Sequence, residues 1–287
     1  MEKCPICSSS NVFMKYPDTL HDDLPAFDYK FTASHNLTYK IMKCRSCGHA
    51  YSVLPKTDIW KNYQSVIDNS YLLRQEERIM TFNKITELIH NYVPDGRLLD
   101  VGCATGDFLL ASQKYYQVEG LEISTWSAEI AKQRGFNIHT YRLSDMPVDE
   151  AYDIVTLWGV IEHFEDPSFE LKHIYRILKK GGVVCLWTGD IDSLTSKLLG
   201  KRWWYIQGQH VQMFSENSLR HLYRQLGFSD VEIGIYPYTT NLQFVYRSLG
   251  RYPSLQPFVK PILLNKLMAN KSITLSLPGE MFAIFKK

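Results

Sequence analysis

The sequence predicts an α/β fold in which most strands of a central sheet run parallel. From residue 97 onward, strand-like apolar segments alternate with helix-like segments, which is typical of parallel strands joined by right-handed helical crossovers. One run, Leu98 to Phe108, combines a buried strand, a tight glycine turn and the start of a helix. An acid, Glu122, ends the next apolar segment. A glycine turn followed by an acid about twenty residues later indicates a nucleoside-binding half-site.

The expected elements follow in order along the chain. Between residues 69 and 93, apolar residues recur every three or four positions, which predicts an amphipathic helix that ends before Pro94. Gly135 and Gly227 mark the ends of two later helices. The predicted helices begin near 107 and span 125–134, 167–178 and 216–226, and the predicted strands are 97–101, 117–122, 137–141, 153–158, 183–188, 230–236 and 281–286.

Size, charge and hydropathy restrict the class of protein. The chain has 287 residues, 45% of them hydrophobic and 22% charged, which is typical of a soluble protein with one large core and one small module. A formal net charge of +2 gives no reason to expect nucleic acid as a partner. The sequence has no run of eighteen apolar residues and no apolar leader, so we expect a cytoplasmic protein.

Four of the six cysteines form two Cys-x-x-Cys pairs, Cys4 with Cys7 and Cys44 with Cys47. Two such pairs are typical of a tetrahedral zinc site, whereas a redox motif would be single and a disulfide would not persist in the cytoplasm. Four cysteine ligands leave no open coordination position, so the zinc is expected to be structural. We therefore predict a zinc-binding module at 1–55, a helical linker at 56–94 and a large domain at 95–287. The other two cysteines, Cys103 and Cys185, are expected in the core.

Four motifs in the large domain carry a family resemblance: Asp100 to Gly106, Val118 to Ser124, Tyr152 to Pro167 and Ile177 to Gly182. In this order they resemble the class I S-adenosylmethionine (SAM)-dependent methyltransferases. The first motif of that family is acid-x-Gly-x-Gly-x-Gly, and alanine stands here at position 104 for the middle glycine. Residues 203–228 are similar to a subgroup with aromatic and His-x-x-x-Phe-Ser signatures.

The resemblance implies a Rossmann-like sheet of seven strands whose last strand is antiparallel, with SAM at the carboxyl ends of the strands. The glycines of the first motif would face the methionine part of SAM, and Glu122 would bind the ribose. The family's third motif often has an acid near adenine, but Arg142 and Leu143 stand there. We therefore expect backbone contacts to adenine. The implied cofactor-binding residues are Asp100, Gly102, Cys103, Ala104, Gly106, Glu122, Ile123, Leu143 and Trp158.

Two histidines are candidates for a general base. Methyl transfer from a sulfonium requires alignment, exclusion of water and, for a hydroxyl acceptor, removal of a proton. His163 follows the fourth predicted strand and His210 lies in the loop after the fifth, where the resemblance implies acceptor contacts. The residues around His210 could form a wall for a small acceptor: Trp203, Trp204, Tyr205 and Gln207.

The function predicted from these motifs is methyl transfer to a small molecule, at a hydroxyl of a sugar, cell-envelope or secondary-metabolite intermediate. Three alternatives remain. The amino-terminal module is similar to that of zinc-bearing sugar C-methyltransferases. A family of ribosomal RNA guanine N-methyltransferases also joins a zinc module to this fold. Finally, the chain could be a SAM-binding partner protein without catalysis. The sequence leaves the oligomeric state open.

A basic, apolar insertion at 241–277 separates the last two predicted strands and contains no acid. Such a composition is typical of contact with an anionic membrane surface or with a phosphate-bearing carrier. The interpretation we favour is an ordinary helical insertion packed on the sheet.

Overall fold

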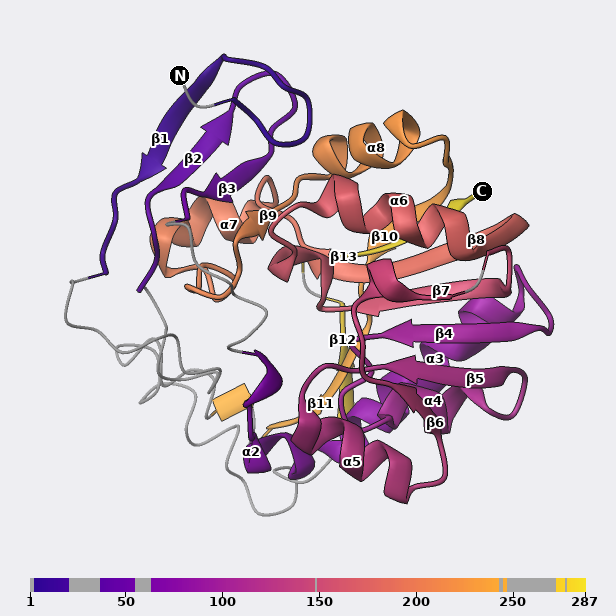
Figure 1. Cartoon of the computed structure of the whole chain (residues 1–287). Coiled ribbons are helices and arrows are strands. Elements are labelled where there is room, and N and C mark those ends of the chain that lie inside the picture. Colours follow the sequence, from indigo (N-terminus) through magenta and orange to yellow (C-terminus); the bar gives the residue numbers. More distant parts are fainter. Residues whose placement is uncertain are drawn as a thin grey trace.

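The computed structural model of the chain describes residues 3–20, 37–54, 63–147, 149–242, 245–246, 272–276 and 278–287. Most of the insertion predicted at 241–277 and part of the predicted linker lie outside the described residues. Figure 1 shows a large sheet with helices on both faces and a small sheet beside it, formed mostly by the amino-terminal part of the chain. Among the described helices, none is long and apolar enough to cross a membrane.

The large sheet has seven strands in the order β10-β13-β8-β7-β4-β5-β6. Its central strands β7, β4 and β5 are parallel, whereas β13 is antiparallel to both of its neighbours. This arrangement confirms the mostly parallel sheet with one reversed strand. The bounds are β4 (Arg97–Val101), β5 (Gln117–Leu121), β6 (Asn137–His139), β7 (Tyr152–Trp158), β8 (Leu178–Gly189), β10 (Ser229–Ile235) and β13 (Glu280–Lys286).

The helices cover both faces of this sheet because each carries one apolar side. On one face, α6 (Pro167–Ile177) and α8 (Glu216–Gln225) bury Leu171 and Leu222 in a cluster with Leu99 of β4. On the other face, α3 buries Phe82, α4 buries Phe108 and α5 buries Ala128 in a cluster with Leu98. The bounds of these three helices are α3 (Gln75–His90), α4 (Asp107–Ser112) and α5 (Thr125–Gln133). Successive side chains of β4 point to opposite faces of the sheet, so Leu98 and Leu99 pack in two separate cores.

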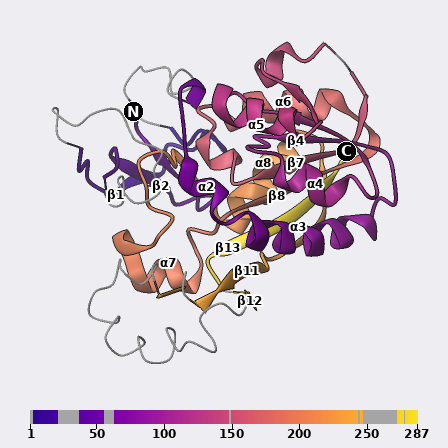
Figure 2. The ribbon, with the colours of Figure 1, turned by 90° about the horizontal axis from the view of Figure 1, so that it is seen from below.

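The amino-terminal strands do not form a sheet of their own. The order in the small sheet is β1-β2-β3-β9, where β1 (Val12–Tyr16), β2 (Ile41–Cys44) and β3 (Ala50–Ser52) come from the predicted module. The fourth strand, β9 (Gln212–Met213), belongs to the large domain. In Figures 1 and 2 the first two of these strands and the C-terminus lie on opposite sides of the molecule.

Several elements differ from their predicted bounds. The helix expected at 69–93 is divided into α2 (Asn69–Leu72) and α3, and the strand expected from 183 begins at Leu178. Short elements with weak periodic patterns were missed: α7 (Leu194–Leu199), β9, β11 (Tyr238–Asn241) and β12 (Ser272–Leu275), and the 3₁₀ turns at 143–145, 161–163 and 200–202. β11 and β12 pair with each other in a separate two-stranded sheet.

Candidate active site

The glycine turn between β4 and α4 has the left-handed backbone that its sequence predicts. Gly102 has φ +70° and Gly106 has φ +83°. A Cβ on Gly102 would lie 2.6 Å from a methyl carbon of Val160, which is closer than side-chain atoms approach. Ala104 also has a positive φ, +46°. The alanine therefore occupies a conformation that favours glycine, at a cost of about 1–2 kcal/mol.

Glu122 connects this turn to the end of β5. Its carboxylate accepts hydrogen bonds from the backbone N–H of Ala104 at 2.8 Å and of Ser124 at 2.7 Å. Burial raises the pKa of Glu122, while these backbone N–H groups favour its ionised form. A carboxylate has four lone-pair positions, so this acid can also accept hydrogen bonds from ribose hydroxyls.

Asp100 accepts a hydrogen bond from Thr156 Oγ1 at 2.7 Å. Burial raises the pKa of Asp100 to about 8, above its ordinary value, because the carboxyl is enclosed at the sheet edge. Without a cofactor, the neutral form of this side chain is therefore favoured.

The chain before α3 lies over the glycine turn. Ser124 Oγ donates to the carbonyl of Val66 at 2.9 Å, and the Tyr71 ring lies 3.5 Å from the Arg78 guanidinium carbon. The same Arg78 pairs with the buried Asp107, which begins α4. Sequence reasoning missed Tyr71, Arg78 and Asp107, because their roles depend on how residues 63–78 pack against the turn.

The other predicted cofactor residues lie near the same edge. Cys103 and Leu143 are buried, and Ile123 is half-buried just beyond β5. Trp158 ends β7 and stacks against Phe282 with a centroid distance of 6.2 Å. The carboxyl ends of β4, β5 and β7 thus bring the turn, Glu122 and Trp158 to one edge of the sheet. Figure 1 shows the arrowheads of β4 and β5 pointing toward the side where the amino-terminal strands lie.

Glu162, His163 and His210 form a cluster beyond this edge, in which Glu162 and His210 are buried and His163 is half-buried. Glu162 accepts hydrogen bonds from Tyr205 Oη and from Thr188 Oγ1, the latter at 3.0 Å. Burial raises the pKa of Glu162 to about 7. The two histidine rings are 4.9 Å apart and nearly perpendicular. The structure therefore brings both predicted base candidates together, beside a carboxyl group that sequence reasoning had not assigned.

Both imidazoles are oriented by backbone carbonyls. His163 Nδ1 lies 2.9 Å from the Gln209 carbonyl and 2.5 Å from Tyr63 Oη, and His210 Nδ1 lies 2.8 Å from the Tyr205 carbonyl. A carbonyl oxygen only accepts, so Nδ1 carries the proton of His210 and the lone pair of that ring is on Nε2. Burial lowers the pKa of His163 to about 4, so this ring is neutral near pH 7.

The cluster has two chemical capacities. Neutral imidazoles can accept a proton, and Glu162, His163 and His210 also offer ligand atoms that all lie within 4.8 Å of one another. Histidine and carboxylate are ligands for divalent metal ions, and a second ring nitrogen bonded to a carbonyl is a common way to orient such a ligand.

The predicted aromatic wall divides into buried and partly exposed residues. Trp203 is completely buried, and Gln207 is buried and donates to the Trp204 carbonyl at 2.8 Å. Trp204 is half-buried and donates through Nε1 to Glu280 at 2.7 Å, and Trp187 donates to the same carboxylate at 3.2 Å. Glu280 was missed because only the reversed direction of β13 brings its first residue to this edge.

The four cysteines of the amino-terminal module converge. Cys4 Sγ lies 3.6 Å from Cys47 Sγ, and Cys7 Sγ lies 3.6 Å from Cys44 Sγ. All four sulfur atoms lie within 4.8 Å of one another, and none forms a disulfide. Four thiolates at about 2.3 Å from zinc would be about 3.8 Å apart, so the donor set fits a tetrahedral ion. Cys103 and Cys185 are buried as predicted.

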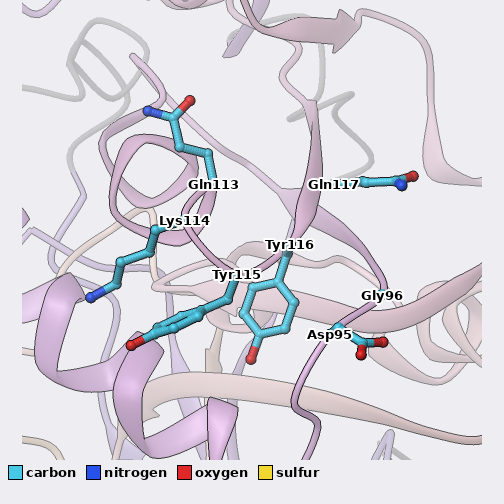
Figure 3. A pocket seen from close by; sticks show the side chains of 7 residues that line it. All are labelled: Asp95, Gly96, Gln113, Lys114, Tyr115, Tyr116 and Gln117. Carbon is cyan, nitrogen blue, oxygen red and sulfur yellow. The ribbon is translucent and has the colours of Figure 1, made fainter.

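A separate pocket lies at the opposite edge of the sheet, beside the amino ends of β4 and β5 (Figure 3). Its volume is about 430 Å³. Seven residues line it: Asp95, Gly96, Gln113, Lys114, Tyr115, Tyr116 and Gln117. None of them is a predicted site residue, and the strand direction places this pocket away from the glycine turn.

Comparison with curated proteins finds methyltransferases. A 26% identical protein of Methanocaldococcus jannaschii, which has no assigned function, matches 55% of this chain and 76% of its own length. The ubiquinone/menaquinone biosynthesis C-methyltransferase UbiE of Geotalea daltonii is 32% identical over 33% of this chain and 46% of its own length. The demethylmenaquinone methyltransferase of Staphylococcus saprophyticus is 23% identical over 61% of this chain and 88% of its own length.

Solved structures share the fold. A SAM-dependent methyltransferase of Thermotoga maritima has a TM-score of 0.53 and 22% identity, covering 76% of this chain and 93% of its own. One from Archaeoglobus fulgidus has a TM-score of 0.51 and 20% identity, covering 77% and 100%. The family model described as a methyltransferase domain matches residues 73–233, more than half of the chain. With its glycine turn, its sheet order and this match, the chain belongs to the SAM-dependent methyltransferase family.

Proposed function

We propose that this enzyme transfers the methyl group of SAM to a hydroxyl of a small-molecule acceptor and that His210 removes the proton of that hydroxyl. The observation that carries this proposal is the cluster of Glu162, His163 and His210 at the acceptor side of the sheet. SAM would bind at the glycine turn, with Glu122 at the ribose.

His210 is the better base of the two histidines. The carbonyl of Tyr205 accepts from its Nδ1–H, which leaves the lone pair of the neutral ring on Nε2. The low pKa of His163 makes that ring a weaker proton acceptor near neutral pH. His163 instead packs against the His210 ring and fixes its orientation.

Trp204, Trp187 and Glu280 would contact the acceptor. Two indole rings beside a carboxylate suit a polar ring with several hydroxyl groups, such as a sugar, because the rings stack and the carboxylate accepts hydrogen bonds. A carrier-bound acceptor is the other chemistry we retain. One relative, 32% identical over 42% of this chain and 49% of its own length, is a malonyl-[acyl-carrier protein] O-methyltransferase of Serratia marcescens, and the basic insertion at 241–277 would suit a phosphate-bearing carrier.

C-methylation is a second candidate reaction. The C-methyltransferase UbiE among the relatives favours it, and a base at His210 could equally remove a proton from carbon to form an enolate. An assay with matched hydroxyl and enolisable acceptors, read by mass spectrometry of the product, would separate the two reactions.

The assignment of His210 is tested by His210→Gln. Release of S-adenosylhomocysteine is measured over a panel of sugars, quinols, acyl-carrier conjugates and ribosomal RNA. We expect kcat on the best acceptor to fall by about 10²–10⁴-fold, while calorimetry gives an unchanged Kd for SAM. An unchanged kcat would contradict the base assignment, and transfer to RNA would contradict the acceptor class. Activity that disappears with a chelator and returns with Mg²⁺ would make the cluster a metal site instead.

We also propose that Cys4, Cys7, Cys44 and Cys47 bind one structural zinc ion. Metal analysis of the purified protein should give one zinc per chain, and Cys44→Ser should abolish it. The small sheet lacks a core large enough to be stable alone, so this variant should also have a lower Tm. A Tm equal to that of the unaltered protein would contradict a stabilising role for the ion.

A further inference from the structure

The small sheet ends directly beside His210. Ala50 of β3 pairs with Met213 of β9, and Tyr51 pairs with Gln212. The pairing extends by one hydrogen bond, from the Ser52 N–H to the Val211 carbonyl at 2.9 Å. The backbone on the carboxyl side of His210 is therefore held by the amino-terminal module.

The other side of this backbone segment contacts the Glu162–His163 turn. The Val211 N–H donates to the Glu162 carbonyl at 2.9 Å, and His163 Nδ1 lies 2.9 Å from the Gln209 carbonyl. Residues 209–213 thus lie between the module and the turn, and they contact both through hydrogen bonds.

Gln212 spans the same junction with its side chain. Its Oε1 accepts from His49 Nε2 at 2.8 Å, and its Nε2 donates to the carbonyls of Phe164 and Glu165, each at 3.1 Å. Gln212 is 4% exposed and His49 is 0% exposed. The Gln212 amide group therefore donates both of its protons to the two residues that directly follow His163, and its oxygen accepts from the amino-terminal module.

His49 follows the second cysteine pair by two residues, so the geometry of that pair sets its place. Ser215 Oγ donates to the Cys47 carbonyl at 3.1 Å, and Gly48 has φ +79°. A Cβ on Gly48 would lie 2.7 Å from Ser215 Oγ. The cysteine turn is thus fitted closely against the segment that follows β9.

Apolar packing joins the same parts. Ile41 and Ala50 of the module are buried in one cluster with Trp203, Tyr205 and Met213. Tyr205 is the residue that donates to Glu162 and whose carbonyl orients His210. The module therefore also packs against Trp203 and Tyr205 of the predicted acceptor wall.

From these contacts we infer that the cysteine module is a positioning element of the acceptor site, in which His49 and Gln212 fix the relative placement of His163 and His210. This inference rests on the proposed function only in the role it gives to the two histidines. Neither His49 nor Gln212 contacts the acceptor; they act through the backbone of 162–165 and 209–213.

The test uses two variants that keep the packing and remove the hydrogen bonds. Gln212→Met removes the hydrogen bonds to His49 and to the carbonyls of Phe164 and Glu165. His49→Phe removes only the hydrogen bond between His49 and Gln212. Tyr116→Phe is the matched control, because it removes the hydrogen bond that a buried side chain donates to the Val93 carbonyl near the opposite edge of the sheet. Zinc content and the Kd for SAM are measured for all three.

The deciding readout is the imidazole nitrogen spectrum of protein labelled with ¹⁵N-histidine. The chain has nine histidines, and the signals of His163 and His210 are assigned from His163→Gln and His210→Gln. We expect Gln212→Met and His49→Phe to keep one zinc and to bind SAM within twofold of the unaltered protein. They should nevertheless shift the His163 and His210 nitrogen signals away from their positions in the unaltered protein. Where an acceptor is available, kcat should fall by about 10²-fold with KM nearly unchanged, because the base is misplaced. Tyr116→Phe should leave these signals and kcat unchanged.

Unchanged His163 and His210 signals in both variants would overturn the inference. If one variant does not fold, the other decides alone, because each removes one side of the same junction. The proposed function fails differently: full activity of His210→Gln would remove the base assignment and leave the spectral result intact.

Discussion

The carboxylate of Glu122 accepts a hydrogen bond from the backbone N–H of Ala104, at 2.8 Å, so the acid that follows β5 fixes the turn that follows β4. Replacing Glu122 with alanine removes this contact and the predicted ribose contact together. We expect the affinity for SAM to fall at least tenfold, since a charge-assisted hydrogen bond contributes about 1.5–3 kcal/mol. Titration calorimetry with SAM and with S-adenosylhomocysteine measures this loss. An affinity within twofold of the unaltered protein would contradict the predicted cofactor site.

Ala104→Gly should not destabilise the protein. Ala104 has a positive φ, which glycine adopts without a steric cost, although glycine loses more backbone entropy on folding. The two effects are each about 1 kcal/mol, so we expect Tm to stay equal or to rise by a few degrees. Ala128→Gly, in a buried turn of α5, is the control and should lower Tm. Equal losses in both variants would contradict the argument.

Asp107 is a buried carboxylate between two arginines. It lies 2.7 Å from an Arg78 nitrogen and 2.7 Å from an Arg134 nitrogen, and its side chain is 1% exposed. Asp107→Asn leaves two arginines without their charge partner, which should cost about 3 kcal/mol in urea unfolding. Lys114→Gln is the control, because the exposed pair of Lys114 with Glu87 should contribute less than about 0.5 kcal/mol. Similar losses in the two variants would be inconsistent with this account.

Asp100 should make the stability of the cofactor-free protein fall as pH rises. The pKa of Asp100 is about 8 in the folded protein and has its ordinary value of 3.8 in the unfolded chain. Between pH 4 and pH 8, the folded state therefore keeps a proton on this carboxyl that the unfolded state has lost. The stability that this carboxyl contributes is therefore present near pH 4 and is lost as pH rises toward 8. Asp100→Asn lacks this titration and keeps an acceptor for Thr156.

The measurement is urea unfolding of both proteins at pH 5, 6, 7 and 8. The stability of Asp100→Asn relative to the unaltered protein should increase with pH, and other pH effects cancel in the difference. A difference that is constant across this range would show that Asp100 is ionised in the folded protein.

Periodicity and glycine turns predicted the seven strands of the large sheet, because six of them have five residues or more and the short β6 follows the helix end at Gly135. They did not predict β9, since two residues carry no period. The split between α2 and α3 was missed because the periodic residues that predict the helix, from Ile79 to Ile89, all lie in α3 and give no information on residues 69–74. Glu280 was missed for a topological reason, since nothing near it in sequence indicates which end of β13 faces the site.

The candidate site residues also divide into those that the sequence could group together and those that it could not. Glu122 and the glycines lie on consecutive elements, so their spacing was sufficient to group them. Glu162, Tyr205 and His210 meet through side-chain contacts between distant segments, and sequence alone pointed to only part of this set. Trp203 illustrates the limit: an aromatic residue beside a predicted base can line a site or lie in the core, and here it is completely buried.

The pairing of β3 with β9 also has a consequence for folding. Ala50 and Met213 are partners that lie 163 positions apart in the chain, as 213 minus 50 gives. Contacts of such long sequence separation close large loops and form slowly. During synthesis, β1, β2 and β3 are made well before β9, the strand that completes their sheet. The sheet that β1, β2 and β3 begin is therefore completed late, and until β9 pairs with it, β3 is an open edge strand exposed to other chains.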